Sequence, residues 1–287
     1  MRIRFAGVNP YDLKIADGIL DGSRPHRFPL VLGVDAAGTV DSVGAEVTRF
    51  RAGDRIFGQF LHSPVGTGTY AEWAPVPEAI GVAPVPPGLS LEDAAALPTA
   101  GMTALYALET LGLSSGSYLV VVGASGGIGS IVTELAASRG VRVIAVARSG
   151  SAGRLRVLGA EEVLDPSSGD PRALLAESHA AGVDGLLDVM SDRKAFADWT
   201  AVVRPGGSAV TTVYAADAEA LQRAGLRGGN IDLQPSRELL TRLTRAILDH
   251  HLKVPLERRI PLEGAPAVLA ELKAGHGTGK TVIDLAA

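Results

Sequence analysis

Short apolar stretches separated by turn residues occupy the first part of the chain. Residues 36–43 and 55–60 are largely apolar and are bounded by glycine, proline and aspartate, a pattern typical of β-strands. A helix is expected after Ser90, because Ser90 together with Asp93 can cap its first turn and an apolar run follows. The pattern therefore predicts a β-rich region over residues 1–95.

From residue 117 the pattern changes to alternating strands and helices. Residues 128–139 and 154–158 have the apolar spacing of helices, and the stretches around them are continuous apolar runs typical of buried strands. The strands are expected at residues 118–122, 141–147, 162–164, 185–189 and 208–213. Such alternation predicts a parallel sheet with helices on both faces, that is, a doubly wound α/β fold.

The last part of the chain adds one helix and one strand. Residues 236–253 have helical spacing, and residues 280–285 have the pattern of a strand. This last strand could return to the β-rich region, which would make the first domain discontinuous.

The composition is that of a globular protein without disulfides. Apolar residues make up 46% and charged residues 20% of the chain, and the absence of cysteine excludes disulfides, thiolate zinc sites and a cysteine nucleophile. The net charge of −4 and the lack of a basic block argue against nucleic acid as a partner. The sequence has no run of 18 apolar residues and no signal core, so we expect no membrane span and a cytoplasmic protein.

One glycine-rich motif carries the strongest chemical signal. Residues 123–129, with the sequence GASGGIG, follow a predicted strand and open a predicted helix. In that place Gly123 allows a tight turn, Gly126 lets backbone N–H groups approach a pyrophosphate, and Gly129 lets the helix pack on the strand. The positive end of the helix dipole adds to anion binding. The motif predicts a Rossmann dinucleotide site, and the alternative is a plain turn.

The end of the next predicted strand favours NADPH over NADH. An NAD site usually has an acidic residue about 20 residues past the last glycine, where it binds the ribose 2′-hydroxyl. Residues 145–151 contain no acid, and Arg148 lies nineteen residues after Gly129, with Ser149 and Arg154 near it. A guanidinium there can bind the 2′-phosphate of NADPH. The alternative is that Arg148 is a solvated surface arginine.

A second glycine-rich segment is rejected as a phosphate loop. Residues 275–281 end in Gly-Lys-Thr, but the first glycine that a nucleotide-triphosphate loop needs would stand at position 274, which is Ala274. A helix should also follow such a loop, whereas residues 281–285 have the pattern of a strand. We interpret the segment as a turn before the last strand.

Several short segments carry a family resemblance through their order and spacing. Besides the glycine loop, they are residues 6–10, 32–40, 52–55, 68–72, 95–98, 101–104, 158–160 and 279–280. On these segments, which span nearly the whole chain, it resembles the medium-chain dehydrogenase/reductase superfamily in its zinc-free quinone oxidoreductase branch. Asn9 with Lys14 five residues later is similar to the enone-reducing members of that branch.

The resemblance implies two domains. It implies a β-rich, GroES-like barrel as the catalytic domain over residues 1–97 and 233–287, and a Rossmann domain with a doubly wound parallel sheet over residues 98–232. Relatives carry further strands before the segment at residues 6–10, so the first domain is expected to be N-terminally shortened, through truncation or through loss of strands. An uncovered sheet edge would then need a partner.

The resemblance also implies how NADPH is bound and how the chain assembles. Asn9 is placed near the nicotinamide, and Val189 and Val213, at strand ends, are placed against the cofactor. Relatives form homodimers by pairing the edge strands of their Rossmann sheets, and this edge is expected here at residues 208–214 and those that follow. Phosphate contacts are implied for Thr103, Ser125, Gly126, Gly127 and Ile128.

Zinc-dependent relatives differ from this sequence at their ligand positions. They carry Cys, and then His-Glu, in the segments that here are residues 8–10 and 33–35. None of the six histidines of the chain has the spacing of zinc ligands. We therefore expect a zinc-independent enzyme with no metal site.

The polar residues of the β-rich region support reduction of a conjugated double bond. Alcohol oxidation without a metal lacks its Lewis acid, whereas enone reduction needs donors that stabilise the developing oxyanion. The candidates are Asn9, Tyr11 and Lys14 on one segment, with His62 and Tyr70 opposite. Each has an ordinary alternative, as a packing tyrosine, a solvated lysine or a loop histidine, and water is an adequate proton donor. A broad apolar pocket is expected to be lined by Phe57, Phe60, Leu61, Trp73 and Tyr214.

These observations together predict an NADPH-dependent, zinc-independent oxidoreductase that reduces quinones or α,β-unsaturated carbonyl compounds by hydride transfer. Two alternatives stay open. One is a pathway-specific reductase or cyclase of secondary metabolism on the same scaffold, and the other is a non-catalytic NADPH-binding protein. Turnover of simple enones and quinones would favour the first reading, and cofactor affinity without turnover would favour the last.

Overall fold

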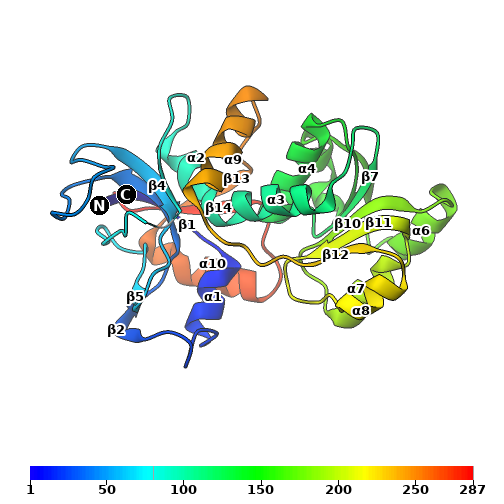
Figure 1. Ribbon diagram of the computed structural model, residues 1–287, viewed down its shortest axis with the longest axis horizontal. Helices are drawn as coiled ribbons and strands as arrows, with labels where there is room; N and C mark the ends of the chain where they lie inside the picture. Colours follow the sequence, from blue (N-terminus) through cyan, green and yellow to red (C-terminus); the bar gives the residue numbers. More distant parts are fainter. Residues whose placement is uncertain (80, 287) are drawn as a thin grey trace. The chain divides into compact units, whose positions relative to one another are not determined.

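The chain forms two compact units, each made from separate stretches of sequence (Figure 1). The structure, a computed structural model, describes residues 1–79 and 81–286, apart from the side chain of Ser149. Unit 1 comprises Met1–Met102, Pro235–Asp249 and Val254–Ala287. Unit 2 comprises Thr103–Gln234 and His250–Lys253.

Unit 1 is built on a six-stranded sheet whose neighbouring strands are antiparallel, except that β13 and β14 are parallel. The order across the sheet is β13 (Leu256–Pro261), β14 (Lys280–Asp284), β1 (Arg2–Gly7), β3 (Asp35–Thr39), β4 (Arg55–Gln59) and β6 (Val82–Pro84). A separate parallel pair consists of β2 (His26–Val31) and β5 (Val65–Thr67). The helices are α1 (Pro10–Ala16), α2 (Leu91–Ala96), α9 (Arg237–Asp249) and α10 (Ala265–Lys273). The predicted β-rich character of this part of the chain is confirmed.

The last strand of the chain lies beside the first. Strand β14 pairs with β1 in the register Phe5↔Asp284 and Gly7↔Val282, so the expected return of the tail to the first domain is confirmed. Asp284 is buried and forms ion pairs with Arg4 on β1 and with Arg259 on β13. These pairs join three neighbouring strands at one point.

Unit 2 holds a six-stranded, wholly parallel sheet. Its order is β12 (Arg227–Asn230), β11 (Val203–Thr211), β10 (Val183–Asp188), β7 (Tyr118–Val122), β8 (Arg142–Val146) and β9 (Ala160–Leu164). The helices are α4 (Gly127–Ser138), α5 (Ala152–Val157), α6 (Pro171–Ser178), α7 (Arg193–Thr200) and α8 (Ala218–Arg223), after α3 (Pro98–Leu111), which contains the unit boundary. Numbered from β7, the order is 6-5-4-1-2-3, which is that of the Rossmann fold.

The edge of this sheet lies one strand farther out than expected from the sequence. Strand β11 pairs with β10 on one side and with β12 on the other, so residues 208–211 lie inside the sheet. The outer strand is β12, whose sequence Arg-Gly-Gly-Asn has no apolar residue. A strand of that composition has no apolar pattern, so the sequence predicts β11 as the last strand of the sheet.

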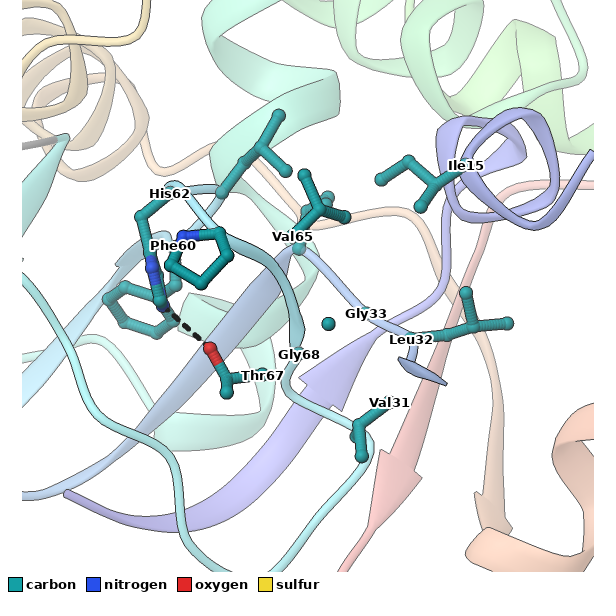
Figure 2. Close-up of a pocket in the computed structure, with 13 residues that line it drawn as sticks. Ile15, Val31, Leu32, Gly33, Phe60, His62, Val65, Thr67 and Gly68 are labelled. Atoms are coloured by element: carbon teal, nitrogen blue, oxygen red, sulfur yellow. Dashed lines mark hydrogen bonds between the residues drawn. The ribbon is translucent and has the colours of Figure 1, made fainter. Parts of the chain in front are cut away.

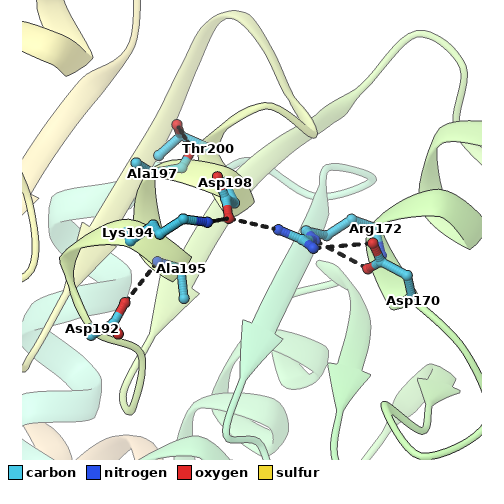
Figure 3. A network of polar contacts seen from close by, with 8 residues as sticks. All are labelled: Asp170, Arg172, Asp192, Lys194, Ala195, Ala197, Asp198 and Thr200. Carbon is cyan, nitrogen blue, oxygen red and sulfur yellow. Dashed lines mark hydrogen bonds and ion pairs between the residues drawn. The ribbon is translucent and has the colours of Figure 1, made fainter.

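Helix α7 illustrates how unit 2 is held together. Asp192 caps it by accepting a hydrogen bond from the N–H of Ala195 (2.8 Å), and its buried Phe196 and Trp199 pack into the core. At the surface, Arg172 of α6 pairs with Asp198 of α7 at 3.2 Å (Figure 3). Exposed ion pairs of this kind contribute at most about 1 kcal/mol each, so the buried aromatic residues hold the helix in place.

Candidate active site

The glycine loop of unit 2 has the geometry that its sequence predicts. Gly123 has a φ of +82°, and a Cβ there would lie 2.7 Å from Cγ2 of Val189. A Cβ on Gly129 would lie 2.4 Å from the carbonyl oxygen of Gly123. At Gly126 the nearest atom would be 3.5 Å away, so the loop is open at this residue. Gly123 and Gly129 therefore serve the turn and the packing, and Gly126 leaves room for a ligand.

The N-terminus of α4 has N–H groups that can bind an anion. Its N-cap is Gly126, which supplies no side-chain hydrogen bond to the first turn. The N–H groups of a first turn have no partner within the helix, and the helix dipole makes this end partly positive. Gly127 and Ile128 provide the first such groups, so the loop fits a pyrophosphate, the chemistry of a dinucleotide cofactor.

One arginine contacts this loop, and another follows the next strand of the sheet. Arg154 of α5 donates from Nη2 to the carbonyl oxygen of Ser125 at 2.7 Å and from Nη1 to Oγ of Ser130 at 3.1 Å. Arg148 is exposed and lies beyond the end of β8 at Val146. The side chain of Ser149 lies outside the described residues.

The other predicted cofactor residues are distributed over three elements of unit 2. Thr103 is buried in α3. Val189 and Val213 are half-buried and follow the carboxyl ends of β10 and β11. In an open parallel sheet ligands bind outside the carboxyl ends of the strands, so these two positions suit a cofactor contact.

Asn9 lies in a buried polar network of unit 1. Its Oδ1 accepts a hydrogen bond from Nζ of Lys280 at 2.6 Å, and its Nδ2 donates to Oδ2 of Asp35 at 2.9 Å and to the carbonyl oxygen of Gly7 at 3.3 Å. Thr99 donates to the same Asp35 carboxylate from its backbone N–H (2.9 Å) and its hydroxyl (2.7 Å). The Asn9 amide is therefore fully engaged within the unit.

Asp12 extends this network toward Tyr70. Its Oδ2 accepts hydrogen bonds from the N–H of Asn9 and from the hydroxyl of Tyr70, both at 2.8 Å. Its Oδ1 is enclosed and has no hydrogen-bond partner among the described residues. Burial raises the pKa of Asp12 to about 7, against the opposing effect of the Asn9 and Tyr70 hydrogen bonds.

The charges of the network do not balance. Asp12, Asp35 and Lys280 are all buried, so two carboxyl groups share one ammonium. Burial raises the pKa of Asp35 and lowers the pKa of Lys280, and in each case the opposite charge of the other group acts against burial. The pKa of Tyr70 is raised, first by burial and then by the charge of Asp12. Uncompensated buried charge favours a proton on one carboxyl group at neutral pH.

The two other candidates on the Asn9 segment have different surroundings. Tyr11 is half-buried and packs on an apolar cluster that contains Ile15, Val34 and Val65. Lys14, in the last turn of α1, is exposed. The structure thus brings Asn9 and Tyr70 together through Asp12 and leaves Lys14 outside the network.

A pocket lies on unit 1 beside α1 (Figure 2). Among the described residues that line it there is no Asp, Glu, Lys or Arg. Its polar side chains are His62 and Thr67, which are joined by a hydrogen bond of 3.0 Å between Nε2 and Oγ1. The lining residues are Ile15, Val31, Leu32, Gly33, Val34, Phe60, Leu61, His62, Pro64, Val65, Gly66, Thr67 and Gly68. The described lining of the pocket therefore offers no counter-ion to a charged ligand.

The expected lining was only partly right. Phe60 and Leu61 line the pocket, but Phe57 points into the protein interior and is wholly buried. Trp73 is half exposed and lies outside the lining, with the guanidinium of Arg2 over its ring. Tyr214, on unit 2, is exposed, and its hydroxyl donates to Asp232 at 3.0 Å. Phe57 is enclosed because it lies between Ala37 on β3 and Ala83 on β6, both buried, and directly opposite residues of paired strands share one face of the sheet.

Neither a metal centre nor a membrane-spanning helix is found among the described residues. No group of three His, Asp or Glu residues lies close enough to hold a metal ion in the stretches that the structure describes. No described helix is both long enough and apolar enough to cross a bilayer.

Known proteins resemble this chain over most of its length. The family model for the alcohol dehydrogenase GroES-like domain matches residues 1–87, and that for zinc-binding dehydrogenases matches residues 158–283. The chloroplast envelope quinone oxidoreductase homolog of Arabidopsis thaliana is 29% identical over 99% of this chain and 88% of its own length. The 2-methylene-furan-3-one reductase of Solanum lycopersicum is 30% identical over 99% and 70%. A mycobacterial protein solved in complex with NADPH superposes with a TM-score of 0.85 at 26% identity, over 99% of this chain and 90% of that one.

The β-rich GroES-like unit, the Rossmann unit with its glycine loop, and these matches define an oxidoreductase that uses a nicotinamide cofactor. The chain belongs to the medium-chain dehydrogenase/reductase superfamily, in its quinone oxidoreductase branch. The resemblance found in the sequence and the predicted fold class are thereby confirmed.

Proposed function

We propose that this protein is an NADPH-dependent, zinc-independent reductase of quinones or α,β-unsaturated carbonyl compounds. The observation that carries the substrate class is the pocket of unit 1, whose described lining has no charged side chain and one imidazole beside one hydroxyl. A neutral carbonyl compound can enter such a pocket without leaving a buried charge unpaired, whereas a carboxylate substrate would lack a counter-ion.

The choice of NADPH rests on the end of β8. No acid stands at residues 145–151 to bind a ribose 2′-hydroxyl, and the exposed Arg148 can reach a phosphate instead. The similar mycobacterial structure holds NADPH, which favours the same cofactor here. Thr103, Ser125, Arg154, Val189 and Val213 are proposed to contact the remainder of the cofactor.

When bound, the reduced nicotinamide supplies a hydride. The residues of this chain would bind the substrate and stabilise the charge that develops on its carbonyl oxygen, and His62 is the donor that lines the pocket. Lys14 and Tyr11 are proposed to assist from α1, and Asn9 with Tyr70 would act through the buried network described above. Water can then protonate the enolate. We further propose that the enzyme acts in the cytoplasm as a homodimer.

The test is turnover by the purified full chain. NADPH consumption is measured with 2-cyclohexen-1-one and with 1,4-benzoquinone, and the saturated ketone cyclohexanone is the control. We expect oxidation of NADPH with one of the first two acceptors, none with cyclohexanone, and the same rate after prolonged EDTA treatment. Tight NADPH binding without turnover on either acceptor would instead indicate a non-catalytic NADPH-binding protein. Loss of activity with EDTA, restored by zinc, would reject zinc independence.

A further inference from the structure

The position of Thr67 in the pocket is fixed by the two glycines on either side of it. It lies in β5 between Gly66 and Gly68, and both glycines touch the backbone of the neighbouring chain segment. A Cβ on Gly66 would lie 2.2 Å from the carbonyl oxygen of Arg27, and a Cβ on Gly68 would lie 2.1 Å from that of Leu32. The segment that carries Thr67 is therefore held directly against residues 27–32. As a β-branched residue Thr67 also has few side-chain rotamers, so its hydroxyl is held in place.

The hydroxyl of Thr67 has one proton and one evident acceptor. Its only hydrogen-bond partner among the described residues is Nε2 of His62, at 3.0 Å. If Nε2 carried the imidazole proton, it would donate to Oγ1 of Thr67, and the proton of the Thr67 hydroxyl would have no acceptor among the described residues. The arrangement that gives this proton an acceptor within the protein has Thr67 donating to an unprotonated Nε2. In neutral His62 the ring proton then lies on Nδ1.

The second ring nitrogen of His62 is the one left for a ligand. Nδ1 makes no hydrogen bond within the described part of the chain, and it is not among the enclosed polar atoms without a partner. Free imidazole side chains favour the opposite tautomer, with the proton on Nε2. The contact with Thr67 would thus reverse the ordinary preference and present an N–H donor in a pocket without charges.

We propose that Thr67 is a positioning residue that holds His62 in the Nδ1–H tautomer, so that the pocket offers a neutral N–H donor to the carbonyl oxygen of an apolar ligand. The carbonyl ligand in this inference rests on the proposed function, whereas the tautomer of His62 does not depend on it. A neutral donor selects a carbonyl compound over an ammonium or other cation, because only the carbonyl oxygen can accept its hydrogen bond.

The test of the tautomer needs no cofactor and no turnover. Two-bond proton–nitrogen correlation spectra of the full chain with ¹⁵N-labelled histidine are recorded at pH 8, above the range in which free imidazole titrates. His62→Gln assigns the resonance. We expect the proton on Nδ1 in the wild type and in Thr67→Ser, and on Nε2 in Thr67→Val, which keeps the shape and removes the hydroxyl. Thr110→Val, an exposed threonine on α3, is the control that should leave the spectrum of His62 unchanged. A proton on Nε2 in the wild type, or on Nδ1 in Thr67→Val, overturns the positioning role.

The test of the donor role uses a ligand. Titration with 2-cyclohexen-1-one should shift the Nδ1 resonance of His62, and titration with cyclohexene, which has no carbonyl group, should not. In turnover, Thr67→Val should lower kcat/KM for the enone about tenfold, the size of one hydrogen bond, and Thr67→Ser should restore most of it. If His62 has the Nδ1–H tautomer but the enone does not shift its Nδ1 resonance, the role of His62 as a donor to the ligand is rejected and the positioning role of Thr67 is kept. Failure of the wild type to reduce any carbonyl acceptor rejects the proposed function and leaves the tautomer result standing.

Discussion

At the scale of single residues, the main feature is the buried trio of Asp12, Asp35 and Lys280. Breaking a buried ion pair is costly because it leaves a charge without a partner, and here one carboxyl group already lacks one. The carboxyl group without a counter-ion is that of Asp12, whose Oδ1 is enclosed and has no hydrogen-bond partner among the described residues. Burial raises the pKa of this group to about 7.

The first prediction concerns Asp12→Asn. The folded pKa of Asp12, about 7, lies above its ordinary value of 3.8. The folded protein thus keeps a proton that the unfolded chain has lost, so this group makes stability fall as pH rises from about 4 to 7 and adds no further slope above that range. The amide of Asn keeps the acceptor for Asn9 and Tyr70 and cannot ionise. The variant should therefore show a flatter stability profile and greater stability at pH 8, measured by urea unfolding. Asp17→Asn, at an exposed ion pair with Lys273, is the control. Equal slopes in wild type and Asp12→Asn would contradict the assignment.

The second prediction concerns cofactor choice. Arg148→Ala removes the charge proposed to bind the 2′-phosphate, and loss of one charge-assisted hydrogen bond costs about 1.5–3 kcal/mol. The Kd for NADPH should rise tenfold or more while the Kd for NADH stays nearly constant, as measured by fluorescence titration. Arg139→Ala, an exposed arginine at the end of α4, should change neither. Equal weakening of both cofactors would reject the role of Arg148.

The third prediction concerns Lys14. It is exposed, and the next residue, Ile15, lines the pocket. Lys14→Met keeps the length of the side chain and removes its charge, so kcat/KM for an enone should fall on the order of 10²-fold, the size seen for loss of one oxyanion donor. Because Lys14 is exposed, the Tm should move little. Lys194→Met, on the surface of unit 2, is the control. Unchanged turnover would make Lys14 a solvated bystander, and a collapse of the Tm would make it structural.

The sequence offered candidate residues without their partners. Asn9, His62 and Tyr70 were singled out as hydrogen-bonding side chains on the family resemblance, and their catalytic roles stay predictions. The contacts of Asn9 with Lys280 and of Tyr70 with Asp12 join distant parts of the chain. No local pattern specifies such pairs. Asp12 had a local signal, since an acid three residues after an N-cap is typical of a capping box.

At the scale of elements, the apolar runs predicted the inner strands of unit 2 well. Residues 118–122 are strand β7 as expected, because a strand buried on both faces needs a continuous apolar sequence. The polar edge strand β12 and the Pro-containing β2 had no such signal, since their positions depend on a neighbouring strand. Ser90 does cap α2, with its Oγ accepting the N–H of Asp93 at 2.9 Å. The helix expected over residues 236–253 ends at Asp249, and His251 beyond it has a φ of +52°.

The fourth prediction belongs to the junction of β7 and α4. Gly129→Ala would place a Cβ 2.4 Å from the carbonyl oxygen of Gly123 and 2.6 Å from Cα of Ala124. Backbone atoms cannot move aside cheaply, so the variant should lose about 1–3 kcal/mol of unfolding free energy in urea. Gly153→Ala, in α5 with no atom within 4 Å of the new methyl group, should instead be neutral or gain up to about 1 kcal/mol. Equal stability of the two variants would show that the contact is unimportant.

At the scale of the whole molecule, the sheet of unit 2 ends in a strand that another chain can pair with. Strand β12 pairs only with β11 among the described strands, so its outer N–H and C=O groups face away from the sheet. Edge strands of this kind are templates for association, and two copies related by a two-fold axis can pair through them.

The fifth prediction is that the protein is a dimer through β12. Sedimentation equilibrium at micromolar concentration should give about twice the chain mass of 29.5 kDa. Hydrogen exchange at residues 227–230 should then be slower at high than at low protein concentration. A mass near that of one chain would reject the dimer.

The pairing of β1 with β14 has a consequence for how the molecule is made. On the ribosome, residues 2–7 emerge long before residues 280–284, by some tens of seconds at about 5–20 residues per second. Unit 2 has left the ribosome before β14 is made, so we expect it to fold first. During this time one side of β1 has no partner strand. An unpaired strand edge is a template for aggregation. Unit 1 should thus be the part of the nascent chain that depends on chaperones, and slowing translation should lengthen its exposure.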